Sequence, residues 1–408
     1  MRRFLASLCL SLLPVALGPA CGSSDPPEVT SGPRTDAGGD AKDADVVLPD
    51  GASLDTGTGD ASSDADPDAP LAPVRVGIWA TPASGEAGPA PGDALTADLA
   101  VLSAGARVGM LRSRWSDLFD GATPSIATWN DVDVRASAYR SAGAEVIACL
   151  AVIDRTEAVR PTGINGAWDS PALTKAGEAL VDRAFDTFGD ELTVLSLGLE
   201  VDRYLAVAPP AQRSAFVAFV RHVFDYAHQH PKAPNKLRLG IGFNRRALIN
   251  PASPEVRDLA AAGDVVVLHY VPLDDEFALD PQSNPLADLD ALYTALSAEA
   301  AAVPAIVLQE VALPSSAAAG GSDAKQEAFF EAFFKALSVR RERFPMVIAG
   351  QLNDGPQADC ELAAGAAQNP PSPAAIGAYC SRGVKSSSGN AKPAQNRVFE
   401  ALAAFSSP

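Results

Sequence analysis

The sequence predicts an α/β protein whose main domain, residues 73–408, is a (β/α)8 TIM barrel preceded by a signal peptide and a disordered linker. From residue 74 onward, short β-branched and apolar runs alternate with longer segments whose apolar residues recur at helical spacing. Eight such runs occur over about 330 residues, which is the strand number and length typical of a barrel. Each run is therefore expected to be a strand that is followed by a helix.

The expected strands are the runs at 74–79, 108–112, 145–153, 192–199, 237–243, 265–270, 305–311 and 346–352. Among the helices, one begins at Ser170-Pro171 and ends at Gly189, because Pro favours the first turn and Gly the end. Further helices are expected at 210–228, at 286–300 and from Ser322 onward. The last of these carries a phenylalanine stripe that is expected to pack on the sheet: Phe329, Phe330, Phe333 and Phe334.

An open, doubly wound sheet is the competing fold. It would require a glycine-rich phosphate loop after an early strand. The segment 85–92 contains glycines, but its two prolines remove amide donors that such a loop needs. The barrel is therefore preferred.

The first 72 residues predict export to the cell envelope. Residues 1–21 have Arg2 and Arg3 before an apolar run at 4–17, which is too short to span a bilayer, and they end at Cys21. This resembles a bacterial lipoprotein signal, in which Cys21 would be lipidated; the alternative is an ordinary signal cleaved near Ala20. Residues 22–72 are rich in Gly, Ser, Pro and Asp and lack aromatic residues, which predicts a disordered tether.

The chain is acidic, with a formal net charge of −18. Binding of nucleic acid depends on neutralising phosphates with Lys and Arg, and docking on anionic lipid has the same need. We therefore expect no nucleic-acid partner, contact with the membrane only through an N-terminal lipid anchor, and a monomer.

Neither a cofactor nor a metal is predicted. His228 and His230 are two residues apart, so they do not share a helical face. Cys149 lies inside an apolar run, where a buried and inert thiol is expected. Cys360 and Cys380 flank a loop rich in Pro, Gly and Ala, and in an exported protein they are expected to form a disulfide.

Polar and aromatic residues follow nearly every expected strand, at the end where a barrel carries its chemistry. Together they favour a site that binds a polyhydroxylated ligand. The candidate substrate-binding residues are Trp79, Arg112, Arg114, Trp115, Asn244, His269, Tyr270, Gln351 and Asn353.

Glu200 and Glu310 are the candidate catalytic residues, because each directly follows an apolar run. Alternation along 192–199 places the leucines on the outer face and turns Glu200 into the barrel mouth. For Glu310 to point inward by the same rule, Gln309 has to face outward. Strands 4 and 7 lie on opposite sides of an eight-stranded barrel, so the two carboxyl groups are expected to face each other. Such a pair is what a retaining glycosidase uses, with one acid/base and one nucleophile.

The motifs resemble those of the clan A glycoside hydrolases. Leu197-Gly-Leu-Glu200-Val-Asp-Arg-Tyr204 is similar to the family's strand-4 motif, which implies that Glu200 is the acid/base. Ile306-Val-Leu-Gln-Glu310 is similar to the strand-7 motif, which implies that Glu310 is the nucleophile. The resemblance also implies that Tyr270 hydrogen-bonds the nucleophile, and that Arg112 or Arg114 is the strand-2 arginine that contacts it.

Two departures from this family leave an alternative open. Leu199 stands where the family has Asn before the acid/base, and Gln351-Leu352 stands where it often has a strand-8 Trp. A non-catalytic carbohydrate-binding lipoprotein on a degenerate barrel is therefore the second hypothesis. A structural envelope protein, with side chains filling the barrel mouth, is the third.

Overall fold

The computed structural model describes residues 73–83, 92–251, 253–298 and 305–406. The signal peptide, the linker and Cys21 lie outside the described residues, so what we expect of them stays a prediction. Within the described ranges, no helix combines the length and the apolar character needed to cross a bilayer.

All eight predicted strands are present. They are β1 (Arg75–Trp79), β2 (Val108–Arg114), β5 (Glu145–Asp154), β7 (Leu192–Leu199), β8 (Arg238–Gly240) with β9 (Gly242–Asn244), β10 (Val265–Tyr270), β11 (Ala305–Val311) and β12 (Met346–Asn353). The fifth predicted strand is divided into β8 and β9 at Ile241. Two-residue strands β3 (Phe119–Asp120), β4 (Thr123–Pro124) and β6 (Glu157–Ala158), and the short β13 (Gly383–Lys385), lie in connections.

The strands form parallel ladders that follow the chain order. One ladder runs β2-β5-β7-β8, and the other runs β9-β10-β11-β12-β1. β1 meets β2 where the Arg107 amide donates to the Val76 carbonyl at 3.2 Å. The backbones approach so closely there that a Cβ on Gly77 would lie 1.9 Å from the Val108 carbonyl oxygen, so this position requires glycine. The two ladders thereby join into the predicted barrel.

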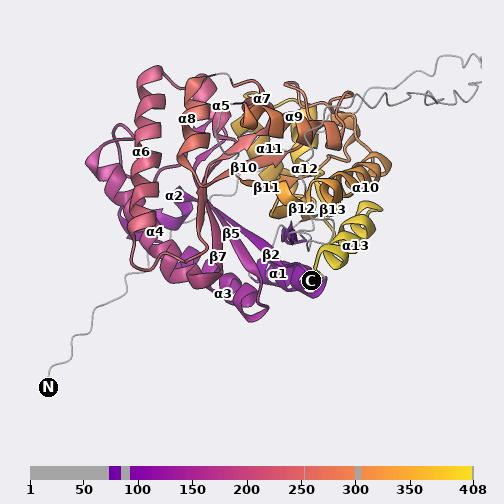
Figure 1. Ribbon diagram of the computed structural model, residues 1–408, viewed down its shortest axis with the longest axis horizontal. Coiled ribbons are helices and arrows are strands. Elements are labelled where there is room, and N and C mark those ends of the chain that lie inside the picture. The colour runs from indigo at the N-terminus through magenta and orange to yellow at the C-terminus, as the bar shows by residue number, and fades with distance from the viewer. Residues whose placement is uncertain (1–72, 84–91, 252, 299–304, 407–408) are drawn as a thin grey trace, which may run out of the picture. The chain divides into compact units, whose positions relative to one another are not determined.

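Helices follow the strands and lie outside them (Figure 1). The longer ones are α1 (Asp93–Ser103), α3 (Ile126–Ser141), α4 (Pro171–Phe188), α6 (Pro210–Gln229), α8 (Pro254–Ala262), α9 (Pro285–Ser297), α10 (Asp323–Val339) and α13 (Ala394–Ser406). The shorter ones are α2 (Trp115–Leu118), α5 (Val201–Val207), α7 (Arg245–Ile249) and the 3-10 turns Gly189–Glu191, Ala317–Ala319 and Arg341–Arg343. The α10 phenylalanines are buried, and Phe329 and Phe333 pack against the ring of Tyr270 on β10, which confirms that this stripe covers the sheet.

Alternation along the strands separates two apolar cores. Val108, Ile147, Val194 and Val307 belong to a cluster inside the barrel. Leu195 and Leu197 of β7 belong to the larger cluster beneath the helices. The predicted alternation of β7 is therefore confirmed, and the residue after Leu199 continues on the side that faces the mouth.

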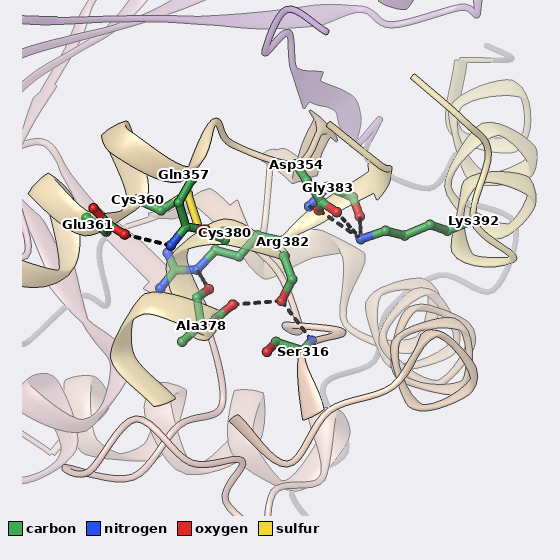
Figure 2. Close-up of a disulfide and its surroundings, with 12 residues drawn as sticks. Ser316, Asp354, Gln357, Cys360, Glu361, Ala378, Cys380, Arg382, Gly383 and Lys392 are labelled. Atoms are coloured by element: carbon green, nitrogen blue, oxygen red, sulfur yellow. Dashed lines mark hydrogen bonds and ion pairs between the residues drawn. A yellow bond between two sulfur atoms is a disulfide. The ribbon is translucent and has the colours of Figure 1, made fainter. Parts of the chain in front are cut away.

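Two helices follow β12 where the sequence predicted a loop. These cap helices, α11 (Gln357–Ala367) and α12 (Pro373–Cys380), are joined by the Cys360–Cys380 disulfide, whose Cα atoms are 5.1 Å apart (Figure 2). Their apolar faces share a small core with Phe277 from the connection after β10. The segment is alanine-rich, which favours helix once a disulfide and a core hold it. The cap helices thus bring Tyr379 and the following Arg382 to the barrel mouth.

Candidate active site

Glu310 reaches the barrel interior through an irregularity in β11. Leu268 pairs with Leu308, but His269 pairs with Glu310, so β11 carries one extra residue, Gln309. Such a bulge changes the direction of the side chains that follow it. The expectation that Gln309 faces outward is wrong. Gln309 is fully buried, and its side chain lies beside the Cys149 thiol of β5. Burial raises the pKa of this thiol to about 11, although Arg112 and Gln309 both act to lower it.

The Glu310 carboxylate is held by three side chains. Its Oε1 accepts hydrogen bonds from Arg382 Nη1 at 3.1 Å and from Gln351 Nε2 at 3.3 Å. Its Oε2 lies 3.3 Å from Nδ1 of His269. Burial alone would raise the pKa of this carboxyl group. The positive charge of Arg382, together with the His269 contact, outweighs burial and holds the pKa well below its usual range.

Glu200 stands at the end of β7 and begins α5 with a left-handed backbone, φ 47°. That conformation is unusual for a residue other than glycine, and strain of this kind tends to occur at functional sites. Oε2 accepts a hydrogen bond from Arg203 Nε at 2.6 Å, and the residue is 3% exposed. Burial would raise its pKa, but Arg203, Arg155, His269 and Arg382 together lower it to about 2.

Both glutamates therefore interact with the same two groups. Arg382 and His269 lower the pKa of Glu310 and of Glu200 alike. One cavity of about 360 Å³ is lined by Glu310, and another of about 480 Å³ is lined by Glu200. Arg382 lines both cavities.

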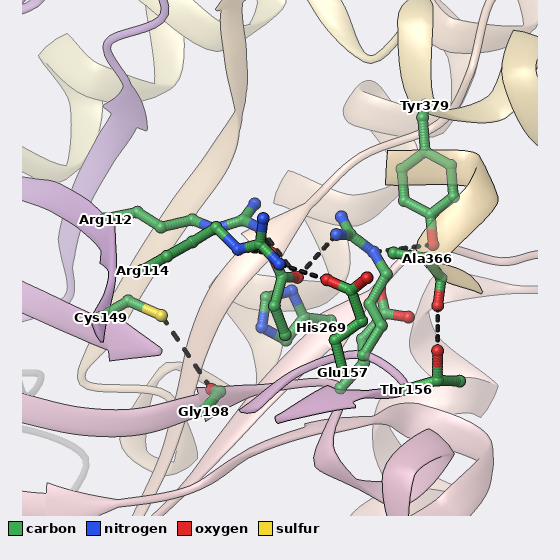
Figure 3. A network of polar contacts seen from close by, with 12 residues as sticks. Arg112, Arg114, Cys149, Thr156, Glu157, Gly198, His269, Ala366 and Tyr379 are labelled. Atoms are coloured by element: carbon green, nitrogen blue, oxygen red, sulfur yellow. Dashed lines mark hydrogen bonds and ion pairs between the residues drawn. The ribbon is translucent and has the colours of Figure 1, made fainter. Parts of the chain in front are cut away.

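Three arginines surround Asp154, the last residue of β5. Figure 3 shows two of them, Arg112 and Arg114, side by side. Arg112 Nη2 lies 3.1 and 3.2 Å from the two carboxylate oxygens, and Arg155 Nη1 lies 2.7 Å from Oδ1. Arg114 Nε lies 3.4 Å from Oδ2, and its Nη2 pairs with Glu157. Burial opposes the ionised form of Asp154, but these guanidinium groups prevail and lower its pKa.

Several predicted site residues do lie on the two cavities. Trp79, Arg112, Arg114 and Gln351 line the cavity of Glu310. Asn244 lines the cavity of Glu200, and its backbone amide donates to Asp202 at 2.8 Å. His269 touches Glu310 directly, as described above.

Other predicted residues are placed elsewhere. Trp115 is fully buried and packs against Phe219, 5.9 Å between ring centroids, so it cannot touch a ligand here. The amide of Asn353 donates from Nδ2 to the Thr81 carbonyl at 2.7 Å, which ties β12 to the segment after β1. Both residues therefore stabilise the fold where a role in sugar binding was expected.

The contacts that the resemblance implied for the nucleophile are also corrected. Tyr270 donates its hydroxyl to Asp288 at 2.8 Å on the helix side, because the inward positions of β10 are Val265, Val267 and His269. Arg112 and Arg114 bind Asp154, and Arg382 provides the guanidinium on Glu310. His269 thus replaces Tyr270, and Arg382 replaces a strand-2 arginine.

Arg382 and Tyr379 are site residues that no sequence pattern indicated. Arg382 follows β12 by many residues, and no periodic pattern marks it. Its Nε donates to the Ala378 carbonyl at 2.9 Å, and its guanidinium lies 4.4 Å from the centre of the Tyr379 ring. The predicted Cys360–Cys380 disulfide was the one signal that this segment folds back. Within the described residues, no three His, Cys, Asp or Glu side chains are grouped so as to hold a metal ion.

This sequence matches no known family model and no curated protein. Solved structures match the barrel at low identity. A GH5_18 protein from Streptomyces cattleya, in complex with Manβ1-4GlcNAc, is 14% identical, with a TM-score of 0.60 and 81% of each chain covered. A GH5_18 protein from Bifidobacterium longum subsp. longum is 18% identical, with a TM-score of 0.61 over 82% of this chain and 79% of that one.

A GH2 beta-galacturonidase from Eisenbergiella tayi is 12% identical, with a TM-score of 0.53 over 81% of this chain and 51% of that one. The chain has the fold of the GH5 and GH2 glycoside hydrolase barrels. At these identities the similarity establishes the fold alone, and any activity has to be argued from the residues of the site.

Proposed function

We propose that this protein is a retaining glycoside hydrolase that acts on a polysaccharide or oligosaccharide. The supporting observation is that two buried carboxylates, at the ends of the fourth and seventh barrel strands, both interact with Arg382 and His269. In the proposed reaction, Glu310 attacks the anomeric carbon while Glu200 protonates the leaving oxygen. Water then attacks the glycosyl–enzyme ester, and Glu200 takes up its proton.

The charges at the site suit the nucleophile directly. A nucleophilic carboxylate has to be ionised, and Arg382 and His269 keep Glu310 in that form. The proton donor has the opposite requirement, because a general acid must carry its proton at the working pH. With its pKa near 2, Glu200 meets this requirement only after Arg203 leaves its carboxylate. Arg203 is partly exposed on the cavity beside Glu200, so a bound sugar can displace it.

A non-catalytic carbohydrate-binding role is the second candidate. The Glu200–Arg203 ion pair favours it, since it removes the proton donor at neutral pH. Leu199 favours it as well, because an apolar side chain cannot hydrogen-bond the sugar 2-hydroxyl, a contact worth several kcal/mol in such transition states. In this role, the same cavities would hold a sugar without cleaving it.

Turnover separates the two candidates. Wild type, Glu310→Gln and Glu200→Gln are compared on a panel of aryl glycosides and polysaccharides between pH 3 and pH 8. We expect Glu310→Gln to reduce hydrolysis to background and Glu200→Gln to reduce it by about 10²–10⁴-fold. Glu331→Gln, a matched change on the outer helix α10 at a side chain that is 65% exposed, should be unaffected. Sugar binding without turnover at any pH would establish the second candidate.

We also propose that the barrel is held in the cell envelope by a lipid on Cys21, with residues 22–72 as the tether. One lipidated cysteine with a long polar spacer would leave the barrel free to reach a glycan. Fractionation of cells that express wild type or Cys21→Ala tests this. The variant should leave the membrane fraction, and its retention there would contradict the proposal.

A further inference from the structure

The cavity beside Glu310 contains more buried positive charge than negative charge. Five guanidinium groups line it, and four of them lie around Asp154 and Glu310: those of Arg112, Arg114, Arg155 and Arg382. Two largely buried carboxylates oppose them, Asp154 and Glu310, with side chains 7% and 4% exposed. The remaining charges of the lining are already compensated or lie at the surface. Arg135 pairs with Asp98 at 2.6 Å, and Lys392 pairs with Asp354 at 2.7 Å.

The acids that would restore neutrality lie at the rim. Glu157 is 49% exposed and pairs with Arg114, and Asp359 is exposed. Water and salt screen charges at the rim far more than charges in the interior. When Arg114 and Glu157 are counted as a pair, the buried part of the lining has the guanidinium groups of Arg112, Arg155 and Arg382 against two carboxylates. It therefore holds one positive charge in excess, in a chain whose net charge is −18. A positive cavity in so acidic a protein attracts an anion selectively.

The cavity also has the features that bind a sugar ring. Trp79 lines it with a partly exposed indole, and the Arg112 guanidinium lies over one face of that ring, 5.4 Å from its centre, so a sugar would have to use the other face. An aromatic face of this kind packs against the apolar face of a pyranose. Arg114 is the most exposed of the four arginines, at 28%, and its partner Glu157 is a carboxylate that a ligand can replace.

Resting on the proposed function, we infer that this cavity selects an acidic sugar, a residue that carries a carboxylate or a sulfate ester. Its ring lies on Trp79, and its anionic group takes the place of Glu157 on Arg114 beside Arg112. A guanidinium group binds a planar carboxylate or a sulfate through paired N–H donors, which gives both affinity and orientation.

Calorimetric titration at pH 7 tests this inference with galacturonate, glucuronate and galactose 6-sulfate against galactose and glucose. At least one acidic sugar should bind about ten-fold more tightly than its neutral counterpart, and 0.5 M NaCl should weaken its binding. Binding of the uronates alone identifies a carboxylate as the anionic group, and binding of the sulfate ester alone identifies a sulfate. Equal binding of neutral and acidic sugars, or no binding of any acidic sugar, overturns the inference. Acetate that binds as tightly as galacturonate also overturns it, because the sugar then contributes nothing.

Two single substitutions at the rim should move the affinity in opposite directions. Arg114→Gln should weaken acidic-sugar binding about ten-fold, and Glu157→Gln should strengthen it, while neutral sugars are unaffected by either. Arg221→Gln, a matched change at a side chain that is 56% exposed on α6, should change nothing. Equal affinities in Arg114→Gln and wild type would overturn the inference. Because binding is the readout, the inference can hold even if Glu310→Gln shows that the protein does not hydrolyse glycosides.

Discussion

Arg382 holds Glu310 through a hydrogen bond of 3.1 Å from Nη1 to Oε1, and both side chains are almost completely buried. The guanidinium group comes from the segment after the cap helices, and Glu310 is the second-last residue of β11. Arg382 also borders the cavity of Glu200. Arg382 is therefore the main group that keeps the proposed nucleophile ionised, and it lines the cavities of both glutamates.

Replacing Arg382 with Gln should raise the pKa of Glu310, because burial raises this pKa and the Arg382 charge is the main effect that lowers it. A nucleophile must be ionised, so the acidic limb of kcat/KM should move to higher pH, with partial recovery in Arg382→Lys. Titration of ¹³C-labelled glutamate, assigned with Glu310→Gln, reports the same shift without turnover. Removing one partner of a buried pair should also cost about 3–5 kcal/mol in urea unfolding. An unchanged Glu310 titration would contradict this role.

Replacing Arg203 with Gln should raise the pKa of Glu200 above its value of about 2. The proton donor must be protonated, so the basic limb of kcat/KM should move to higher pH and neutral-pH activity should increase. Arg246→Gln is the matched control, because Arg246 lines the same cavity but pairs with the exposed Asp275. If the basic limb stays in place, Arg203 does not set the ionisation of Glu200.

Opening the disulfide should loosen the cap helices. Cys360 and Cys380 are 20 residues apart, and closing a loop of that length stabilises a fold by about 3 kcal/mol in the chain-entropy model. The double variant Cys360→Ser/Cys380→Ser should lose about that much in urea unfolding, and reduced wild type should match it. Faster hydrogen exchange confined to 357–382 is the expected local sign. A variant as stable and as protected as oxidised wild type would show that the disulfide is dispensable.

Acidification should destabilise the protein because Glu200 has a lower pKa folded than unfolded. Its ionised form stabilises the fold above the unfolded pKa of about 4.3, and this contribution is lost as pH falls through the folded pKa of about 2. For a side chain this buried, the full loss is about 3 kcal/mol, of which about 2 kcal/mol is reached at pH 2.5. Urea unfolding at pH 6 and pH 2.5 measures it, and Glu200→Gln should flatten the dependence where Glu331→Gln does not. An equal slope in all three proteins would refute this contribution.

The sequence by itself determined the eight strands, the outward leucines of β7, the position of Glu200 directly after strand 4 and that of Glu310 near the end of strand 7. These follow from apolar alternation, a local property that the barrel preserves because each strand buries one face inside and one beneath helices. The disulfide was predictable from cysteine placement in an exported chain.

Only the tertiary structure decided which charged groups meet. Simple alternation would put only one of Gln309 and Glu310 inside the barrel. The bulge at Gln309 turns Glu310 inward while Gln309 also stays inside. Arg112 pairs with Asp154, and Glu310 pairs instead with Arg382, which comes from a segment without a periodic sequence pattern. The strength of an ion pair depends on the distance between the charges and on how far they are buried, and both are set only when the chain has folded.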